Sequence, residues 1–152
     1  MTANPTQRLL SDSALTVFRL NGQFLALAEE LAASAGLTAT RWQVLGAVLR
    51  EPASVSEIAR IMGITRQSVQ RTADLLVADG LAEYRDNPAH RRAKLVAPTS
   101  AGYDALDRIN PAHRLAAQAL AERLDPEEWR RTVDALQKLS TTLAELDTET
   151  GR

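Results

Sequence analysis

Cysteine is absent from this 152-residue sequence, which excludes disulfide bridges, cysteine-ligated zinc or iron–sulfur centres and thiol chemistry. The only two histidines, His90 and His113, are too few for a histidine-rich metal cluster, and we expect neither a metal nor another cofactor. Aromatic residues are also scarce, with two Phe, two Trp and two Tyr. A hydrophobic core must therefore be built mostly from Leu, Val, Ile and Ala.

Long apolar segments are lacking as well. No run approaches the roughly 18 residues that a membrane-spanning helix needs. Residues 1–5 lack the basic-then-apolar pattern of a secretory signal. The length, with 45% hydrophobic and 24% charged residues, is that of an ordinary globular domain. We therefore expect a cytoplasmic protein without a membrane partner.

The formal net charge of −1 hides an uneven distribution. Residues 41–94 contain nine Lys/Arg and six Asp/Glu, whereas the rest of the chain contains nine Lys/Arg and thirteen Asp/Glu. A basic middle between acidic ends suggests an anionic partner for the middle segment. A chance fluctuation of surface charge explains a difference this small equally well, so charge alone does not decide between the two.

Apolar residues recur at the helical spacing from Asp12 to Ala35, and Gly36 provides a stop. A second helix follows, with Thr38 or Thr40 as its N-cap. The pattern Thr40-x-x-Gln43 fits reciprocal capping at this start.

The next stretch predicts a helix-turn-helix. Ser54-x-x-Glu57 forms a capping box that opens a short helix. Gly63-Ile64-Thr65 breaks this helix, and Thr65 caps the next one over residues 66–78. Two short helices joined by a three-residue turn containing Gly are typical of this motif.

After Gly80 the pattern changes to short strands. Residues 81–85 and 94–97 read as two strands, and the polar loop between them contains His90-Arg91-Arg92. A helix-turn-helix followed by a hairpin with a basic tip is a winged helix.

The C-terminal third predicts two further helices. Thr99 caps a long helix that should kink at Pro111, because proline lacks an amide donor and crowds the preceding turn. The segment Asp125-Pro126-Glu127-Glu128 has the residue types of a helix start. The final helix carries apolar residues at nearly heptad spacing.

We therefore predict a mainly α fold with a small β component (α+β). A winged helix-turn-helix spans residues 37–98, and a helical dimerisation part is formed by both chain ends, residues 9–36 and 99–147. The polar segments 1–8 and 148–152 are expected to be frayed tails. The apolar stripes of the terminal helices are wider than a small winged domain needs, which suggests a homodimer. The expected dimerisation residues include Leu136, Leu143 and Leu146.

In order and spacing, these motifs make the chain resemble the MarR family of bacterial transcriptional regulators from about Ser11 to Leu146. The resemblance rests on Leu37-Thr38, Trp42–Leu45, Ser54–Ile64, Thr65–Val69, Asp79-Gly80-Leu81 and His90–Gly102. It implies a homodimer that binds pseudo-palindromic double-stranded DNA, usually as a repressor and often released by a small molecule.

Two positions depart from the family pattern. His90 stands where the family wing usually has Asp, which commonly holds a wing arginine. Pro98 replaces the leucine of the usual Leu-Thr pair at the end of the strand. Because Pro98 cannot donate a ladder hydrogen bond, we expect this strand to be short or at a sheet edge.

DNA contacts are expected from the second helix of the helix-turn-helix and from the wing. Arg and Gln suit the edges of bases in the major groove, and arginines at a loop tip suit a narrow minor groove. A merely solvated charged surface is the alternative. The expected DNA-binding residues are Thr65, Arg66, Gln67, Ser68, Gln70, Arg71, Arg91, Arg92 and Lys94.

The resemblance also implies a pocket for a small lipophilic effector, neutral or anionic, between the helical and winged parts. Its candidate lining residues are Phe18, Phe24, Trp42, Tyr103 and His113. The alternative is that the aromatic residues are core residues.

Catalysis is not expected. The sequence contains no nucleophile–base constellation, glycine-rich phosphate loop or metal-ligand spacing. The two hypotheses for function are a dimeric DNA-binding transcriptional regulator, as a repressor released by an effector, and a winged-helix protein–protein interaction module without DNA binding.

Overall fold

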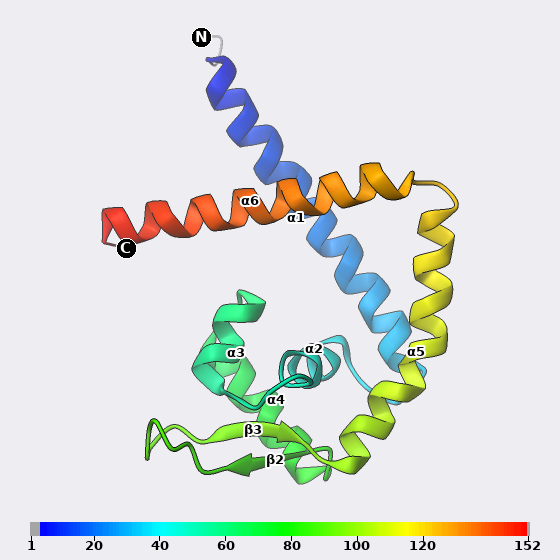
Figure 1. Ribbon diagram of the computed structural model, residues 1–152, viewed down its shortest axis with the longest axis vertical. Coiled ribbons are helices and arrows are strands. Elements are labelled where there is room, and N and C mark those ends of the chain that lie inside the picture. The colour runs from blue at the N-terminus through cyan, green and yellow to red at the C-terminus, as the bar shows by residue number, and fades with distance from the viewer. Residues whose placement is uncertain (1–3, 152) are drawn as a thin grey trace. The chain divides into compact units, whose positions relative to one another are not determined.

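The computed structural model describes residues 4–151 and shows a mainly helical chain with one small antiparallel sheet (Figure 1). This confirms the predicted fold class. The chain divides into two compact units, and the boundary along the sequence lies between Ala112 and His113, just after Pro111 in α5. The elements are α1 (Pro5–Ala33), α2 (Ala39–Ala47), β1 (Ala53–Ser54), α3 (Val55–Met62), α4 (Arg66–Ala78), β2 (Ala82–Arg85), β3 (Leu95–Pro98), α5 (Ser100–Ala121) and α6 (Pro126–Thr150).

Helix α2 organises the core of the first unit, because it contacts α1, α3 and α4. Each of these helices contributes aliphatic residues at helical spacing, so one face of each becomes buried. The sheet covers the same core, with β1 against α3 and β2 against α4. The fully buried side chains that form it include Val44, Leu45, Val48, Ile58, Val69, Leu76 and Val96.

The turn between α3 and α4 forms as the sequence predicts. Ser54 Oγ accepts a hydrogen bond from the backbone N–H of Glu57 at 3.2 Å, and the Glu57 carboxylate accepts one from the Ser54 N–H at 3.4 Å. Gly63 ends α3 with φ of +67°, a left-handed conformation that glycine adopts without strain. Thr65 Oγ1 then accepts from the N–H of Ser68 at 3.1 Å and caps α4.

The sheet has the order β1-β3-β2, so β3 is its central strand. Of the two alternatives expected for a strand that ends at Pro98, the strand is short and does not lie at an edge. Strand β1 pairs only with Leu95 and Val96, whereas β2 continues along β3 as far as Pro98. Pro98 consequently has a neighbouring strand on one side only, which is why its missing N–H is tolerated.

The terminal helices extend into the segments expected to be frayed. Helix α1 begins at Pro5, because Asn4 and Gln7 form a reciprocal capping box at its start. The Asn4 side-chain oxygen accepts from the N–H of Thr6 at 3.0 Å, and the Gln7 side-chain oxygen accepts from the N–H of Asn4 at 3.0 Å. Helix α6 continues to Thr150. Residues 1–3 and 152 lie outside the described residues.

The start of α2 also differs from one expectation. Thr38, not Thr40, is the N-cap, since its Oγ1 accepts from the N–H of Arg41 at 3.2 Å. The Thr40-x-x-Gln43 pattern therefore has no capping role.

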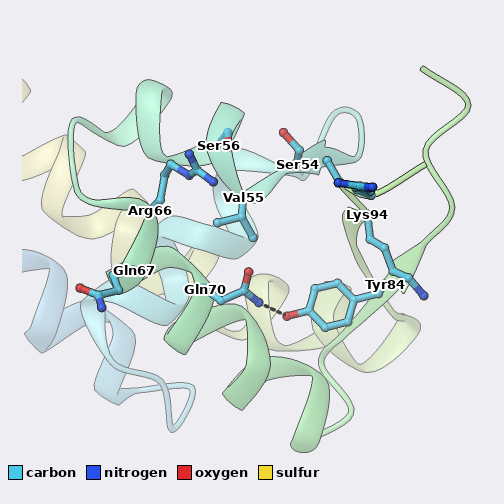
Figure 2. Close-up of a pocket in the computed structure, with 10 residues that line it drawn as sticks. Ser54, Val55, Ser56, Arg66, Gln67, Gln70, Tyr84 and Lys94 are labelled. Carbon is cyan, nitrogen blue, oxygen red and sulfur yellow. Dashed lines mark hydrogen bonds between the residues drawn. The ribbon is translucent and has the colours of Figure 1, made fainter. Parts of the chain in front are cut away.

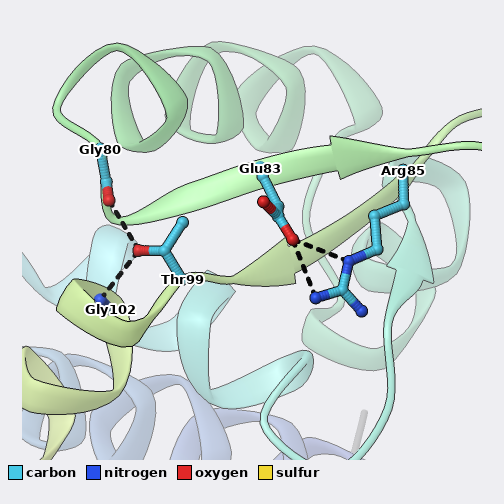
Figure 3. A network of polar contacts seen from close by, with 5 residues as sticks. All are labelled: Gly80, Glu83, Arg85, Thr99 and Gly102. Atoms are coloured by element: carbon cyan, nitrogen blue, oxygen red, sulfur yellow. Dashed lines mark hydrogen bonds and ion pairs between the residues drawn. The ribbon is translucent and has the colours of Figure 1, made fainter.

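A compact junction ties the base of the wing to the first turn of α5 (Figure 3). Thr99 Oγ1 donates to the carbonyl of Gly80 at 2.6 Å and accepts from the N–H of Gly102 at 3.2 Å. The Thr99 N–H donates to the carbonyl of Leu81 at 3.1 Å. Gly102 is buried here, and a Cβ at this position would overlap the Leu81 carbonyl oxygen.

We expect Gly102→Ala to lower the free energy of unfolding by about 1–3 kcal/mol, because the added methyl group meets backbone that cannot move aside cheaply. The measurement is urea unfolding followed by circular dichroism. Gly46→Ala is the matched control, since nothing lies within 4 Å of a Cβ at this site in α2. The control should be neutral or stabilising by up to about 1 kcal/mol. Equal effects of the two substitutions would contradict this account of the junction.

Candidate nucleic-acid interface

Helix α4 exposes one face to solvent while it buries the other. Val69, Ala73 and Leu76 have no exposed surface, and Thr72 is also buried. The side chains expected to contact DNA occupy the remaining positions. Among them Ser68 is half-buried, whereas the exposed ones are Thr65, Arg66, Gln67, Gln70 and Arg71.

The exposed face of α4 borders a groove of about 720 Å³ (Figure 2). The start of α3 forms another border, and the wing closes the groove through Tyr84 on β2 and residues 92–94 before β3. Three cationic residues and no carboxylate line it. The lining residues are Ser54, Val55, Ser56, Arg66, Gln67, Gln70, Tyr84, Arg92, Ala93 and Lys94.

Two helix N-termini add to the positive character of the groove. Ser54 is the N-cap of α3, and Arg66 is the first residue of α4; both residues line the groove. The first N–H groups of a helix carry partial positive charge and favour anions. A groove with two such ends and three cationic side chains suits a phosphate backbone.

Two cations of the basic segment, residues 41–94, form ion pairs with neighbouring carboxylates. Arg41 pairs with Asp79 at 2.6 Å, and Arg85 pairs with Glu83 at 2.8 Å (Figure 3). The cationic residues among the predicted DNA contacts form no ion pair within residues 4–151, so they remain available to a ligand. They are Arg66, Arg71, Arg91, Arg92 and Lys94.

The wing loop turns over residues 87–90, and Asn87 supplies both acceptors of this turn. Asn87 accepts hydrogen bonds from the N–H of Ala89 through its side chain, at 3.0 Å, and from the N–H of His90 through its carbonyl, at 3.2 Å. This local Asx turn does not need an acidic residue at position 90. Arg91 and Arg92 follow the turn directly, and both are exposed.

A hydrogen-bond network that joins α4 to the wing was not predicted from the sequence. Tyr84 donates its hydroxyl hydrogen to the Asp74 carboxylate. The Gln70 amide nitrogen donates to Asp74 Oδ1 at 3.0 Å and to the Tyr84 hydroxyl oxygen at 3.0 Å (Figure 2). The i, i+4 spacing of Gln70 and Asp74 was a visible signal for part of it. The contact with Tyr84 is tertiary and has no such signal.

This environment raises the pKa of Tyr84 from 10 to about 12. Burial of the phenol is the largest cause, followed by the hydrogen bond to Asp74 and the negative charge of Asp74, while the hydrogen bond from Gln70 acts in the opposite direction. The folded protein therefore holds this proton more tightly than the unfolded chain does.

We expect Tyr84 to contribute stability in full below about pH 10 and to lose this contribution as the pH rises toward 12, because ionisation places a phenolate beside the Asp74 carboxylate. The measurement compares urea unfolding of the wild type and Tyr84→Phe from pH 8 upward. Groups common to both proteins cancel in the difference. A difference that stays constant through this range would rule out the tyrosine–aspartate hydrogen bond as its source.

The predicted effector and dimerisation residues lie on several elements. Phe18 and Phe24 are 70% and 52% exposed on α1, so the alternative that they are core residues of the single chain is wrong. Trp42 is half-buried on α2, and Tyr103 is exposed on α5. His113 belongs to the second unit. On α6 Leu136 is half-buried, whereas more than half of the surface of Leu143 and Leu146 is exposed.

Two features are absent from the described residues. Residues 4–151 contain no group of three or more His, Cys, Asp or Glu side chains placed to hold a metal ion. None of their helices combines the length and the apolar character needed to cross a membrane.

Comparisons with known proteins agree with the winged-helix geometry. The MarR family pattern matches residues 35–93, which include the helix-turn-helix and most of the wing loop. Uncharacterized proteins of Mycobacterium tuberculosis and Mycobacterium bovis are 38% identical over 136 residues, which cover 90% of this chain and 92% of theirs. This chain belongs to the MarR family.

Solved structures of other proteins share the fold. A mutant MarR from E. coli complexed with operator DNA gives a TM-score of 0.72 at 20% identity, covering 90% of this chain and 99% of that one. CouR from Rhodococcus jostii RHA1, bound to p-coumaroyl-CoA, gives 0.74 at 22% identity, covering 86% and 93%. At these identities the likeness establishes the winged-helix architecture of this MarR protein.

Proposed function

We propose that this MarR protein is a dimeric, sequence-specific DNA-binding transcriptional regulator. The observation that carries the proposal is the cationic groove between α4 and the wing, which has three cationic side chains and no carboxylate. Double-stranded DNA is the partner that fits it, since its phosphates provide a regular line of negative charge beside base edges.

In this proposal α4 enters the major groove of DNA. Gln67 and Arg71 lie one turn apart on its exposed face and contact base edges or phosphates. Arg66, together with Lys94 at the other side of the groove, contacts the phosphate backbone. Thr65 and Ser68 at the start of α4 are further DNA contacts. Arg91 and Arg92 reach the adjacent minor groove.

Dimerisation places two copies of α4 about 10 bp apart on a pseudo-palindromic operator. Exposed apolar side chains in both units support a partner copy, since a monomer rarely exposes so many. In the first unit most of them lie along α1, with Ile61 on α3 as a further one, and in the second they lie on α5 and α6. The most exposed are Leu9, Leu10, Leu15, Phe18, Ile61 and Leu115.

As a regulator bound to a promoter, the dimer would exclude polymerase and act as a repressor in the cytoplasm. We further propose release by a lipophilic small molecule, neutral or anionic. The exposed aromatic residues of α1 and the half-buried Trp42 support such a ligand, which would change the spacing of the two α4 helices. The proposed pocket residues are Phe18, Phe24, Trp42, Tyr103 and His113.

The second candidate function is a protein–protein interaction module without DNA binding. The unpaired wing arginines disfavour it, because a wing that does not bind DNA has no need for exposed cations that lack partners.

Affinity for selected double-stranded DNA at several salt concentrations tests the DNA-binding proposal. We expect Arg91→Ala and Arg92→Ala to weaken binding to all sequences alike and to reduce the log–log salt slope by about 0.9 per lost phosphate contact. Gln67→Ala and Arg71→Ala should each cost about 1–3 kcal/mol per lost base contact and relax the preference at one position.

Arg130→Ala on α6 is the matched control, since it removes the same charge from an exposed site away from the groove residues in sequence. Its salt slope should equal that of the wild type. If both wing variants keep the wild-type affinity and slope, the wing is not a DNA contact. A wild type that binds no double-stranded DNA at low salt favours the interaction module.

For the dimer, we expect Leu136→Glu combined with Leu143→Glu to give a monomer at micromolar concentration, since both charges would enter an apolar interface. Light scattering measures the mass. Gln137→Glu combined with Thr141→Glu adds the same charge to exposed polar positions of α6 and should leave the dimer intact. Dimers of unchanged mass for the leucine variant would show that α6 does not form the interface.

A further inference from the structure

We infer that Tyr84 and Asp74 are positioning residues for DNA recognition, because their hydrogen bond sets the direction in which the wing loop leaves the sheet. This direction brings Arg91 and Arg92 to DNA while α4 occupies the major groove. The inference rests on the proposed DNA binding, and it assigns a role in that binding to two residues outside the expected DNA contacts.

Tyr84 occupies the last position of β2 that faces the body of the unit. Side chains alternate between the two faces of a strand, and Ala82 and Tyr84 are the less exposed ones of β2. Glu83 and Arg85 are exposed and form an ion pair with each other. Pairing with β3 ends at Arg85, opposite Leu95, and the wing loop follows. Tyr84 is therefore the last residue of β2 that can attach the hairpin to α4.

Beside the loop, each strand of the hairpin has one attachment to the rest of the unit. Strand β3 pairs there with β1, through Leu95 and Ser54, and β2 is held to α4 by Tyr84. Within residues 4–151 the loop residues 86–94 add no ion pair, and apart from the ladder their hydrogen bonds are those that Asn87 accepts. Without the tyrosine contact the outer end of β2 would be held by β3 alone, and the loop would be free to turn about β3.

The attachment to α4 is made by polar groups of defined direction. A carboxylate only accepts, so Tyr84 donates its hydroxyl hydrogen to Asp74. The Gln70 amide nitrogen lies 3.0 Å from both of these oxygens and donates to them. Figure 2 shows the Tyr84 phenol pointing from β2 toward Gln70 on α4. Because α4 also presents Gln67 and Arg71, the bond joins the wing to the helix that is proposed to enter the major groove.

The place of this bond favours a role in recognition. Three fully buried residues on the opposite face already hold α4 in the unit, whereas Tyr84 lines the groove together with Arg92 and Lys94. The loop must be ordered for its arginines to enter a minor groove, and order that exists before binding removes this entropic cost from the affinity. Loss of the bond should therefore weaken the DNA contacts of the wing and leave those of α4 intact.

Footprinting of the full-length protein on selected double-stranded DNA tests the two sets of contacts separately. Hydroxyl radicals report on the sugars that border the minor groove, where the wing is proposed to bind, and dimethyl sulfate reports on guanine N7 in the major groove. For Tyr84→Phe we expect about 2- to 10-fold weaker affinity, as the loss of one hydrogen bond gives. Protection should be reduced in the minor groove and retained in the major groove. Tyr103→Phe on α5 removes the hydroxyl of the only other tyrosine and should change neither.

Two substitutions of Asp74 separate the hydrogen bond from the negative charge. Asp74→Asn and Asp74→Leu both remove the charge, but only asparagine keeps an oxygen that accepts from Tyr84. We expect Asp74→Asn to retain the minor-groove protection and Asp74→Leu to lose it. The affinity of Asp74→Leu should be about 2- to 10-fold below that of Asp74→Asn.

A double-mutant cycle shows whether the bond acts through the wing. In a protein that already carries Arg91→Ala and Arg92→Ala, Tyr84→Phe should change the affinity less than 2-fold, because the contacts that it positions are gone. An equal effect with and without the arginines overturns the inference, as do equal footprints of the two Asp74 variants. Protection that Tyr84→Phe reduces in both grooves overturns it too, since the bond would then support the unit as a whole. A wild type that binds no double-stranded DNA, or that leaves the minor groove unprotected, overturns the proposed function or its wing contact instead.

Discussion

The packing of α4 against α2 is the contact on which the groove-facing surface of α4 depends. Val69, Ala73 and Leu76 are fully buried, and their spacing fixes the rotation of α4 about its own axis. Once this rotation is fixed, Gln67, Gln70 and the neighbouring arginines have no other direction than solvent. The same aliphatic residues that stabilise the first unit therefore also determine which side chains a ligand meets.

The wing is held at two levels, at its base and further along the hairpin, and each attachment is specific. At its base, Thr99 bonds to Gly80 and Gly102 and fixes the hairpin to the first turn of α5. Further along, Tyr84 bonds to Asp74 and fixes β2 to the exposed side of α4. Groups held in this way lose little conformational entropy when a ligand binds, which favours specificity over adaptability. The groove between helix and wing is consequently a preformed feature of the unit.

The sequence predicts the local features of this fold well, because caps and turns depend on residues a few positions apart. Ser54 with Glu57 and Thr65 with Ser68 are such cases, and both form as predicted. Features that need a distant partner were missed. Strand β1 has two residues and exists through pairing with β3, about forty positions later. The contact of Tyr84 with Gln70 and Asp74 depends on the same tertiary arrangement, so periodicity gives no sign of it.

The modest charge excess of residues 41–94 understates the positive charge of the groove, because a sum over residues ignores which charges are paired. Glu83 and Asp79 neutralise Arg85 and Arg41, and Glu57 caps α3, so these acidic residues have partners elsewhere. The cations that line the groove have no such partner among residues 4–151. Dissolved ions screen electrostatic interactions beyond about 10 Å at 0.1 M salt. A phosphate in the groove would therefore interact mainly with these nearest cations. Pairing of the acidic residues with other groups, more than the net charge, therefore leaves this surface positively charged.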